Sequence, residues 1–171
     1  MLELLKKRRT VRKFKKEQAE ADTINKIVKA GLLAPSSKDK KPVELVVIND
    51  RAVMDKLKTC KAKGAVGLET SAFAIAVIAD SEKSDVWIED ASIAAILMQL
   101  EAESLGIGSV WIQMRKRQGT FGDSETEVRE VLNIPDNYGV VCVIAFGFKD
   151  EEKHPYDEGS LNMSKVHMEK F

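Results

Sequence analysis

The sequence predicts an α+β domain, a sandwich of helices around one sheet of about four or five strands. Apolar, β-branched segments alternate with helical segments along the chain instead of repeating one type. One helical segment, starting at Trp87, is long and apolar enough to form the spine of a core. The 171 residues, 44% of them hydrophobic, match the size of one domain, so we expect a single domain over 1–171.

Charge and cysteine content argue against several classes of protein. The formal net charge is zero, and acidic residues interrupt the longest apolar run before it reaches the ~18 residues that span a membrane. The first residues lack the apolar region of a signal peptide. Cys60 and Cys142 are far apart, with no CxxC spacing and no histidine cluster for a metal. We therefore expect a cytoplasmic protein with reduced thiols, no metal site, no membrane contact and no nucleic-acid partner.

The amino-terminal segment is the most basic part of the chain. A short amphipathic helix begins at Leu2 and continues into RRTVRKF, residues 8–14. Residues 1–16 contain eight Lys or Arg and one Glu, a net charge of +7. Such a segment is either a solvated surface or an anion site in which arginine forks bind phosphate oxygens. The candidate ligands are Arg8, Arg9, Thr10 and Arg12.

A second helix is predicted from Asp22, a suitable N-cap, to Ala34, where Pro35 ends it. The following segment, APSSKDKKP, is polar and restricted by two prolines. It is either a plain connector or a loop that presents hydroxyl groups and backbone donors to a ligand.

The central part of the chain alternates strand and helix. Asp50 is a suitable N-cap for a helix after the first strand, and Gly106 is placed to end the long helix in a left-handed conformation. Because that helix is apolar on every side, we expect it to be buried. Short apolar runs predict four strands, at residues 44–48, 73–79, 107–112 and 140–146.

The last part of the chain contains a basic loop at 115–117, a helix at 125–132 and a tail from about 150 to 171. The tail has weak periodicity but keeps several large apolar residues, so it needs its own core or a partner subunit to pack on. No GxGxxG, GxxxxGK[ST], GxSxG or HExxH motif is present. The sequence therefore points to neither a Rossmann or P-loop nucleotide site nor a known hydrolase site.

Three motifs in order resemble the FMN-dependent nitroreductase family: RRTVRKF at 8–14, APSSKDKKP at 34–42 and LGIGSVWIQ at 105–113. VLNIP at 131–135 and VHMEKF at 166–171 resemble it more loosely. The resemblance covers nearly the whole chain. It implies a compact three-layer sandwich with a mixed, mostly antiparallel sheet and a long buried central helix. It also implies a homodimer with FMN at the interface and the tail on the partner.

The resemblance further implies a flavin site. Arg8, Arg9, Thr10 and Arg12 would bind the FMN phosphate and ribityl chain, and Lys165, or else Lys153, would be the late basic residue at the phosphate. The other predicted contacts are Pro35, Ser36 and Ser37 from the second subunit, Ile112 and Gln113 through their backbones, and Asp39 and Lys41. This sequence differs from the family at Asp39, Lys41 and Val43, where Asn, Gln and Trp are common.

The implied function is an oxidoreductase that passes electrons from NADH or NADPH to a nitroaromatic or quinone by a ping-pong mechanism. The flavin would carry the chemistry, so no catalytic acid or base is assigned to the chain. One alternative is a flavin-binding sensor or carrier of the same fold. Another is a nucleic-acid-binding module using the basic residues, which the neutral net charge and the few aromatic residues disfavour.

Overall fold

The computed structural model describes every residue from Met1 to Phe171 and confirms the predicted fold class. The helices are α1 (Leu2–Lys7), α2 (Ala21–Leu32), α3 (Arg51–Thr59), α4 (Trp87–Ser104) and α5 (Ser124–Leu132). The strands are β1 (Val43–Ile48), β2 (Phe73–Asp80), β3 (Ile107–Gln113) and β4 (Tyr138–Phe148). Short 3₁₀ turns are η1 (Ser37–Asp39), η2 (Val66–Glu69), η3 (Glu158–Ser160) and η4 (Met163–Lys165).

The sheet has the strand order β1-β2-β4-β3, and all three strand pairings are antiparallel. The only parallel element of the predicted mixed sheet is an isolated bridge between Thr10 and Ser109. Because β3 pairs with β4 on one side only, its other edge carries backbone groups without a strand partner. This edge is where the amino-terminal segment attaches.

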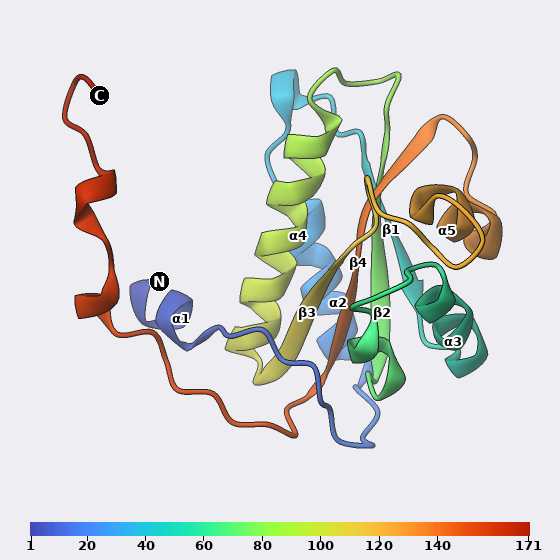
Figure 1. Cartoon of the computed structure of the whole chain (residues 1–171), viewed down its shortest axis with the longest axis horizontal. Helices are drawn as coiled ribbons and strands as arrows, with labels where there is room; N and C mark the ends of the chain where they lie inside the picture. The colour runs from blue at the N-terminus through green and yellow to red at the C-terminus, as the bar shows by residue number, and fades with distance from the viewer.

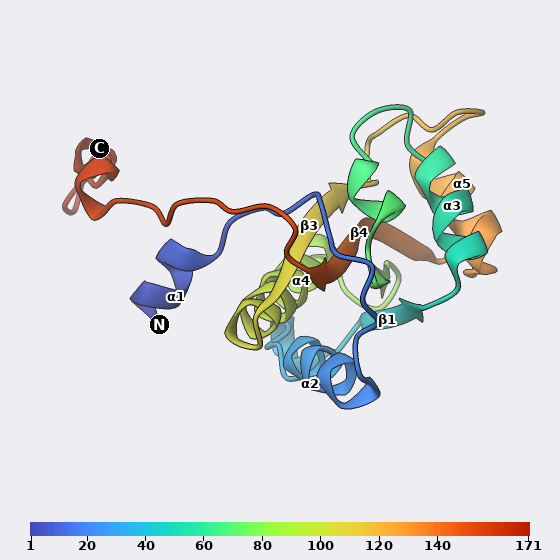
Figure 2. The same ribbon diagram turned by 90° about the horizontal axis from the view of Figure 1, so that it is seen from below.

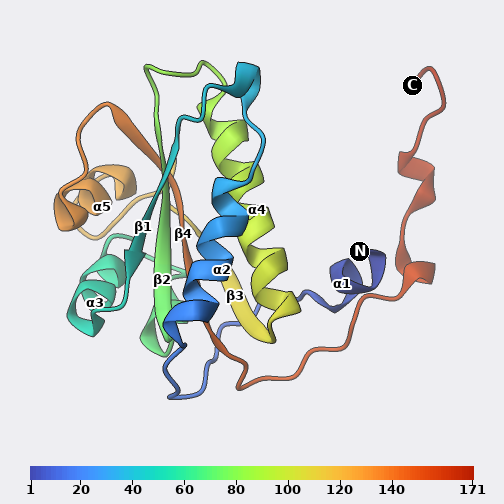
Figure 3. The ribbon, with the colours of Figure 1, turned by 180° about the vertical axis from the view of Figure 1, so that it is seen from behind.

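Helices cover both faces of the sheet (Figures 1 and 3). One layer contains α2 and α4, and the opposite layer contains α3 and α5. The central strands β2 and β4 are therefore buried on both faces, which explains why their sequences are continuous apolar runs rather than alternating ones. Two separate clusters of core residues, one on each face, result from this arrangement.

The central helix α4 is buried on one face and open on another. Ala91, Ala95 and Met98 are fully buried against the sheet. Ile93 and Ile96, on a different face, are each 39% exposed in the single chain. The predicted burial therefore holds for only part of the helix in one chain. As predicted, the helix is followed by a left-handed glycine, Gly106, with φ of +77°.

The predicted N-cap is confirmed for α3 and wrong for α2. The Asp50 carboxylate accepts a hydrogen bond from the backbone N–H of Ala52, as an N-cap does. In contrast, α2 begins at Ala21, so Asp22 lies within its first turn. There the Asp22 carboxylate pairs with Lys26 one turn later, at 2.7 Å. Asp22 thus forms an ion pair along the helix instead of the expected N-cap hydrogen bond.

The carboxy-terminal tail leaves β4 and runs beside the amino-terminal segment. Figures 1 and 2 show both ends of the chain, α1 and the tail, extending away from the sandwich. The large apolar side chains of the tail are exposed: Tyr156, Leu161, Met163, Val166, Met168 and Phe171. None of the helices has the length and apolarity needed to cross a membrane.

Gly139→Ala is expected to destabilise the protein by about 1–3 kcal/mol, because a methyl group has no room at this position. The added Cβ would lie 2.1 Å from Cη2 of Trp87, a large ring at the start of α4. Urea unfolding measures the effect. Gly122→Ala is the control, since a Cβ there meets no atom within 4 Å. Equal stability of the two variants would contradict the packing argument.

Candidate functional site

The amino-terminal segment attaches to the exposed edge of β3 at its beginning. The Val11 N–H donates to the Ser109 carbonyl at 3.0 Å, next to the Thr10–Ser109 bridge. Gly108 permits this approach, because a Cβ there would lie 3.0 Å from the Cβ of Val11. Beneath the edge, the Gln99 side-chain amide of α4 donates to the Ser109 hydroxyl at 3.1 Å. The contacts fix the arginine segment along β3.

Within this segment, apolar and basic residues have separate tasks. Val11 and Phe14 are buried and hold the segment on the domain. The guanidinium groups of Arg8 and Arg12 form no ion pair, although the chain contains nine ion pairs elsewhere. Arg9 differs, since it donates to the His154 carbonyl and lies 4.2 Å from the Tyr156 ring centroid. Arg8 and Arg12 are therefore free to bind an anion, whereas Arg9 is bound to the tail.

Glu151 and Lys153 lock the same segment from the start of the tail. The Glu151 carboxylate accepts the N–H groups of Arg12 at 2.5 Å and Lys13 at 3.2 Å. These bonds, with the Arg12 bond contributing most, hold the pKa of Glu151 below its usual value. Lys153 pairs with Glu151 at 3.3 Å and donates to the Thr10 carbonyl at 2.5 Å.

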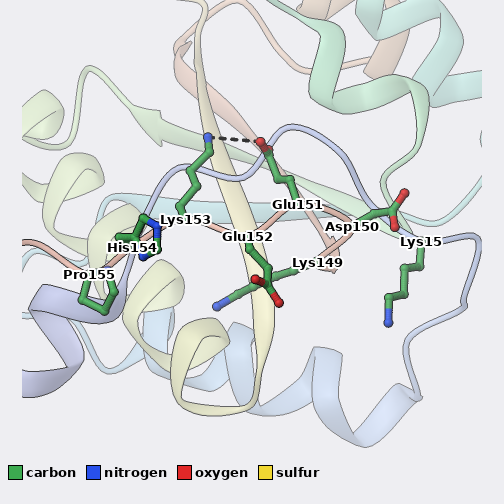
Figure 4. A pocket seen from close by; sticks show the side chains of 8 residues that line it. All are labelled: Lys15, Lys149, Asp150, Glu151, Glu152, Lys153, His154 and Pro155. Carbon is green, nitrogen blue, oxygen red and sulfur yellow. Dashed lines mark ion pairs between the residues drawn. The ribbon is translucent and has the colours of Figure 1, made fainter.

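The structure also separates the two candidates for the late basic residue. Lys153 contacts Thr10, within the arginine segment, whereas Lys165 lies in η4 on the exposed tail. Figure 4 shows Lys153 directed toward Glu151, at the rim of a cavity of about 650 Å³ between Lys15 and Pro155. In one chain, Lys153 is thus the candidate that contacts the arginine segment, through the Thr10 carbonyl.

The loop at 34–42 is anchored on α4 rather than on β3. The Ser37 N–H donates to the Asp90 carboxylate at 2.9 Å, and the Ser84 hydroxyl donates to the same carboxylate at 3.2 Å. Asp90 is only 3% exposed, so these bonds stabilise a buried charge. Sequence reasoning missed Asp90, although an acidic residue in the first turn of an apolar helix was a usable signal.

Asp39 and Lys41 form an ion pair within this loop, with Lys41 Nζ 3.1 Å from an Asp39 carboxylate oxygen. Lys41 Nζ also donates to the Ala34 carbonyl at 3.2 Å. Both residues have positive φ, 53° for Asp39 and 47° for Lys41. Together with Pro35 and Ser36, Lys41 borders a cavity of about 280 Å³.

Ile112 and Gln113 lie at the far end of β3, about 10 Å and 13 Å from Ser109 at roughly 3.3 Å per residue. The Ile112 side chain is fully buried, so only its backbone can reach a ligand. The Gln113 side chain is engaged by the Trp111 indole N–H at 2.8 Å, and its main-chain carbonyl accepts from Lys61 Nζ at 2.9 Å. Sequence reasoning did not single out Lys61.

The predicted residues thus fall into three groups in a single chain. One group is on and along β3: the segment bridged to Ser109 carries Arg8, Arg9, Thr10 and Arg12, and the other end of the strand carries Ile112 and Gln113. Pro35, Ser36, Ser37, Asp39 and Lys41 lie on the loop at α4, and Lys165 lies on the tail. Neither cysteine is a candidate nucleophile, because burial raises the pKa of Cys60 to about 11 and that of Cys142 well above its usual value.

A model of the nitroreductase family matches residues 5–73 and 60–148. The chain belongs to the nitroreductase family. The matched residues include the arginine segment, the loop at 34–42 and β3, which carry the three motifs of the predicted resemblance. The predicted family is therefore confirmed.

The chain is similar to other proteins over all or nearly all of its length. An FMN-dependent nitroreductase from Clostridium difficile R20291 is 45% identical, with a TM-score of 0.97 and complete coverage of both chains. A protein of Archaeoglobus fulgidus, named "Putative NADH dehydrogenase/NAD(P)H nitroreductase", is 33% identical over 99% of this chain and 98% of its own length. The NADPH:FMN oxidoreductase of Vibrio harveyi has the same fold, with 24% identity, a TM-score of 0.84, and coverage of 99% of this chain and 77% of its own.

Proposed function

We propose that this nitroreductase-family protein binds FMN and transfers electrons from NADH or NADPH to a small acceptor such as a nitroaromatic or a quinone. One observation carries the proposal. The guanidinium groups of Arg8 and Arg12 form no ion pair, and they belong to a segment that is bridged to an open strand edge. The cofactor agrees with the name of the Clostridium difficile relative. The cytoplasmic location stays a prediction from the two free thiols.

The residues present fit FMN by their chemistry. Two guanidinium forks suit a phosphate group, since each can donate two parallel hydrogen bonds to its oxygens. The Thr10 hydroxyl lies between them in the sequence and suits a ribityl hydroxyl. Beyond Ser109, the outer edge of β3 offers backbone N–H and C=O groups to a planar ring with donors and acceptors on its rim.

When bound, FMN supplies the hydride and electron transfer. The role of the chain is to bind and orient the cofactor. Arg8 and Arg12 would hold its phosphate, while Lys153 and Glu151 keep the backbone of the arginine segment in place through Thr10 and Arg12. Trp111 and Lys61 hold Gln113 in place through hydrogen bonds to its side chain and its main-chain carbonyl. No side chain is required as a general acid or base.

We also propose a homodimer with the flavin site at the interface. The exposed face of α4 and the apolar tail leave large hydrophobic side chains in water, and a second copy would bury both. The loop at 34–42 is anchored away from the β3 edge, which fits its assignment to the flavin of the other subunit. Lys165 and the rest of the tail would then pack on the partner.

Absorbance and turnover test this function. The purified protein is expected to be yellow, to release FMN on denaturation, and to oxidise NADH or NADPH when an acceptor is added. Parallel lines in double-reciprocal plots at several acceptor concentrations are the expected signature of ping-pong turnover. A colourless, folded protein that does not bind micromolar FMN would reject the proposal. Bound flavin without turnover would instead support a sensor or carrier.

A further inference from the structure

Two neighbouring loops at the end of β3 carry a cluster of cations that no acidic side chain neutralises. The loops are held together by hydrogen bonds from the Ala62 N–H to the Gln118 carbonyl, at 3.0 Å, and from the Thr120 N–H to the Thr59 carbonyl, at 3.1 Å. None of the cations forms an ion pair. We call this group the basic cluster; it consists of Lys61, Lys63, Arg115, Lys116 and Arg117.

The nearby carboxylates accept backbone N–H groups and form no ion pair with these cations. Asp123 caps α5 by accepting the N–H groups of Glu125 and Thr126. Glu125 accepts the Lys116 N–H at 3.4 Å and the Val140 N–H at 3.2 Å, and Glu127 accepts two N–H groups of the loop. The local excess of positive charge also affects Lys61, whose pKa is lowered first by burial and then by the charge of Arg117. An anion bound here would relieve this repulsion.

An exposed aromatic ring projects from the same loop. Residues 118–123 form a tight hairpin, closed by the Gly119 N–H donating to the Gly122 carbonyl at 2.8 Å. Glu127 fixes its tip by accepting the N–H groups of Phe121 at 2.7 Å and Gly122 at 2.6 Å. The Phe121 side chain is nevertheless 89% exposed. A rigid backbone therefore presents a ring that packs on nothing in the chain.

The basic cluster borders the far end of the β3 edge. Lys61 Nζ donates to the Gln113 carbonyl at 2.9 Å, and the Arg115 guanidinium lies 5.8 Å from the Trp87 ring centroid. The arginine segment, with Arg8 and Arg12, is at the opposite end of the strand. The two cationic regions are thus separate, and a second phosphate-bearing molecule could be held beyond Gln113 while the first occupies the arginine segment.

We propose that the basic cluster and Phe121 form the subsite for the adenosine phosphate half of the reductant, and that they favour a 2′-phosphorylated dinucleotide, NADPH, over NADH. The inference rests on the proposed function. Guanidinium groups bind a phosphate dianion through charge-assisted hydrogen bonds, which the 2′-hydroxyl of NADH cannot match. The exposed ring of Phe121 is a stacking surface for adenine. No redox step is assigned to this subsite.

Calorimetric titration with adenosine 2′,5′-bisphosphate and with AMP tests the subsite directly. The bisphosphate is expected to bind at least about tenfold more tightly, the effect of one strong charge-assisted contact. Arg115→Gln combined with Arg117→Gln should abolish this preference, whereas Phe121→Ala should weaken both probes by a similar factor. Lys56→Ala removes an exposed cation from α3, outside the basic cluster, and should leave both affinities unchanged.

In steady-state assays, the double glutamine variant should raise the KM for NADPH at least about tenfold, with the KM for NADH and the kcat at saturation nearly unchanged. Equal affinity for the two probes, or an unchanged preference in the double variant, would overturn the subsite. Its failure is distinguishable from failure of the proposed function. Flavin content and reduction of bound flavin by dithionite test the proposed function and do not depend on the subsite. The two probes test the subsite and can be titrated even if the protein is colourless.

Discussion

Replacing Arg8 and Arg12 together with alanine is expected to weaken FMN binding by about 10²- to 10⁴-fold. Each hydrogen-bonded guanidinium–phosphate contact contributes roughly 1.5–3 kcal/mol, so two such contacts account for this range. Neither guanidinium forms an ion pair in the folded chain, and its removal should therefore leave stability nearly unchanged. Quenching of flavin fluorescence during titration of the flavin-free protein with FMN measures the affinity.

A matched control removes the same amount of charge from the same segment. Lys15→Ala combined with Lys16→Ala lowers the positive charge by two, but both side chains are exposed beyond the buried anchor Phe14. This variant should bind FMN within a few-fold of the parent protein. If the arginine and lysine double variants bound FMN equally well, general electrostatic attraction would explain binding, and the assignment of Arg8 and Arg12 would be wrong.

If the protein forms the homodimer that we propose, Ile93→Glu combined with Ile96→Glu is expected to leave it monomeric at micromolar concentration and to remove most bound flavin. Both side chains are 39% exposed in the single chain, so carboxylates there are solvated in the monomer. In a dimer that covers this face, each would be a buried charge without a partner, which costs several kcal/mol. Light scattering coupled to size-exclusion chromatography gives the oligomeric state, and circular dichroism should report intact folding.

Val66→Glu is the control for introducing a carboxylate at an exposed apolar position. Val66 is 51% exposed and lies in η2, which packs with α3 rather than with α4. This variant should keep the mass and flavin content of the parent protein. A double glutamate variant that was dimeric and yellow would show that the dimer interface does not use this face of α4.

Secondary structure was predictable where one physical cause dominated. The runs at β2 and β4 are apolar throughout because both faces are covered, and Gly106 ends α4 because glycine adopts positive φ without strain. Asp22 shows the limit of such reasoning. A capping residue is recognised by its type, but an Asp within the first turn can also pair with a lysine one turn on, and local sequence does not distinguish the two.

The candidate site was predictable in part. The resemblance pointed to the arginine segment and β3, but it did not indicate that Arg9 is bound to the tail while Arg8 and Arg12 remain unpaired. The resemblance favoured Lys165 over Lys153 as the late basic residue, but the choice depends on where the chain runs after β4, and in one chain it is Lys153 that contacts Thr10. Asp90, Glu151 and Lys61 act through contacts with residues distant in sequence, which no local pattern reveals.

The sequence by itself determined the fold class, the order of helices and strands, the family and the presence of a concentrated basic segment. These properties follow from side-chain periodicity, turn chemistry and charge, all of which are local along the chain. Only the tertiary structure decided which cations are neutralised, which face of α4 stays open, and that the basic cluster and Phe121 lie at the same end of β3. Those properties depend on contacts between residues that are distant in the chain, and burial and pairing are set only when the chain has folded.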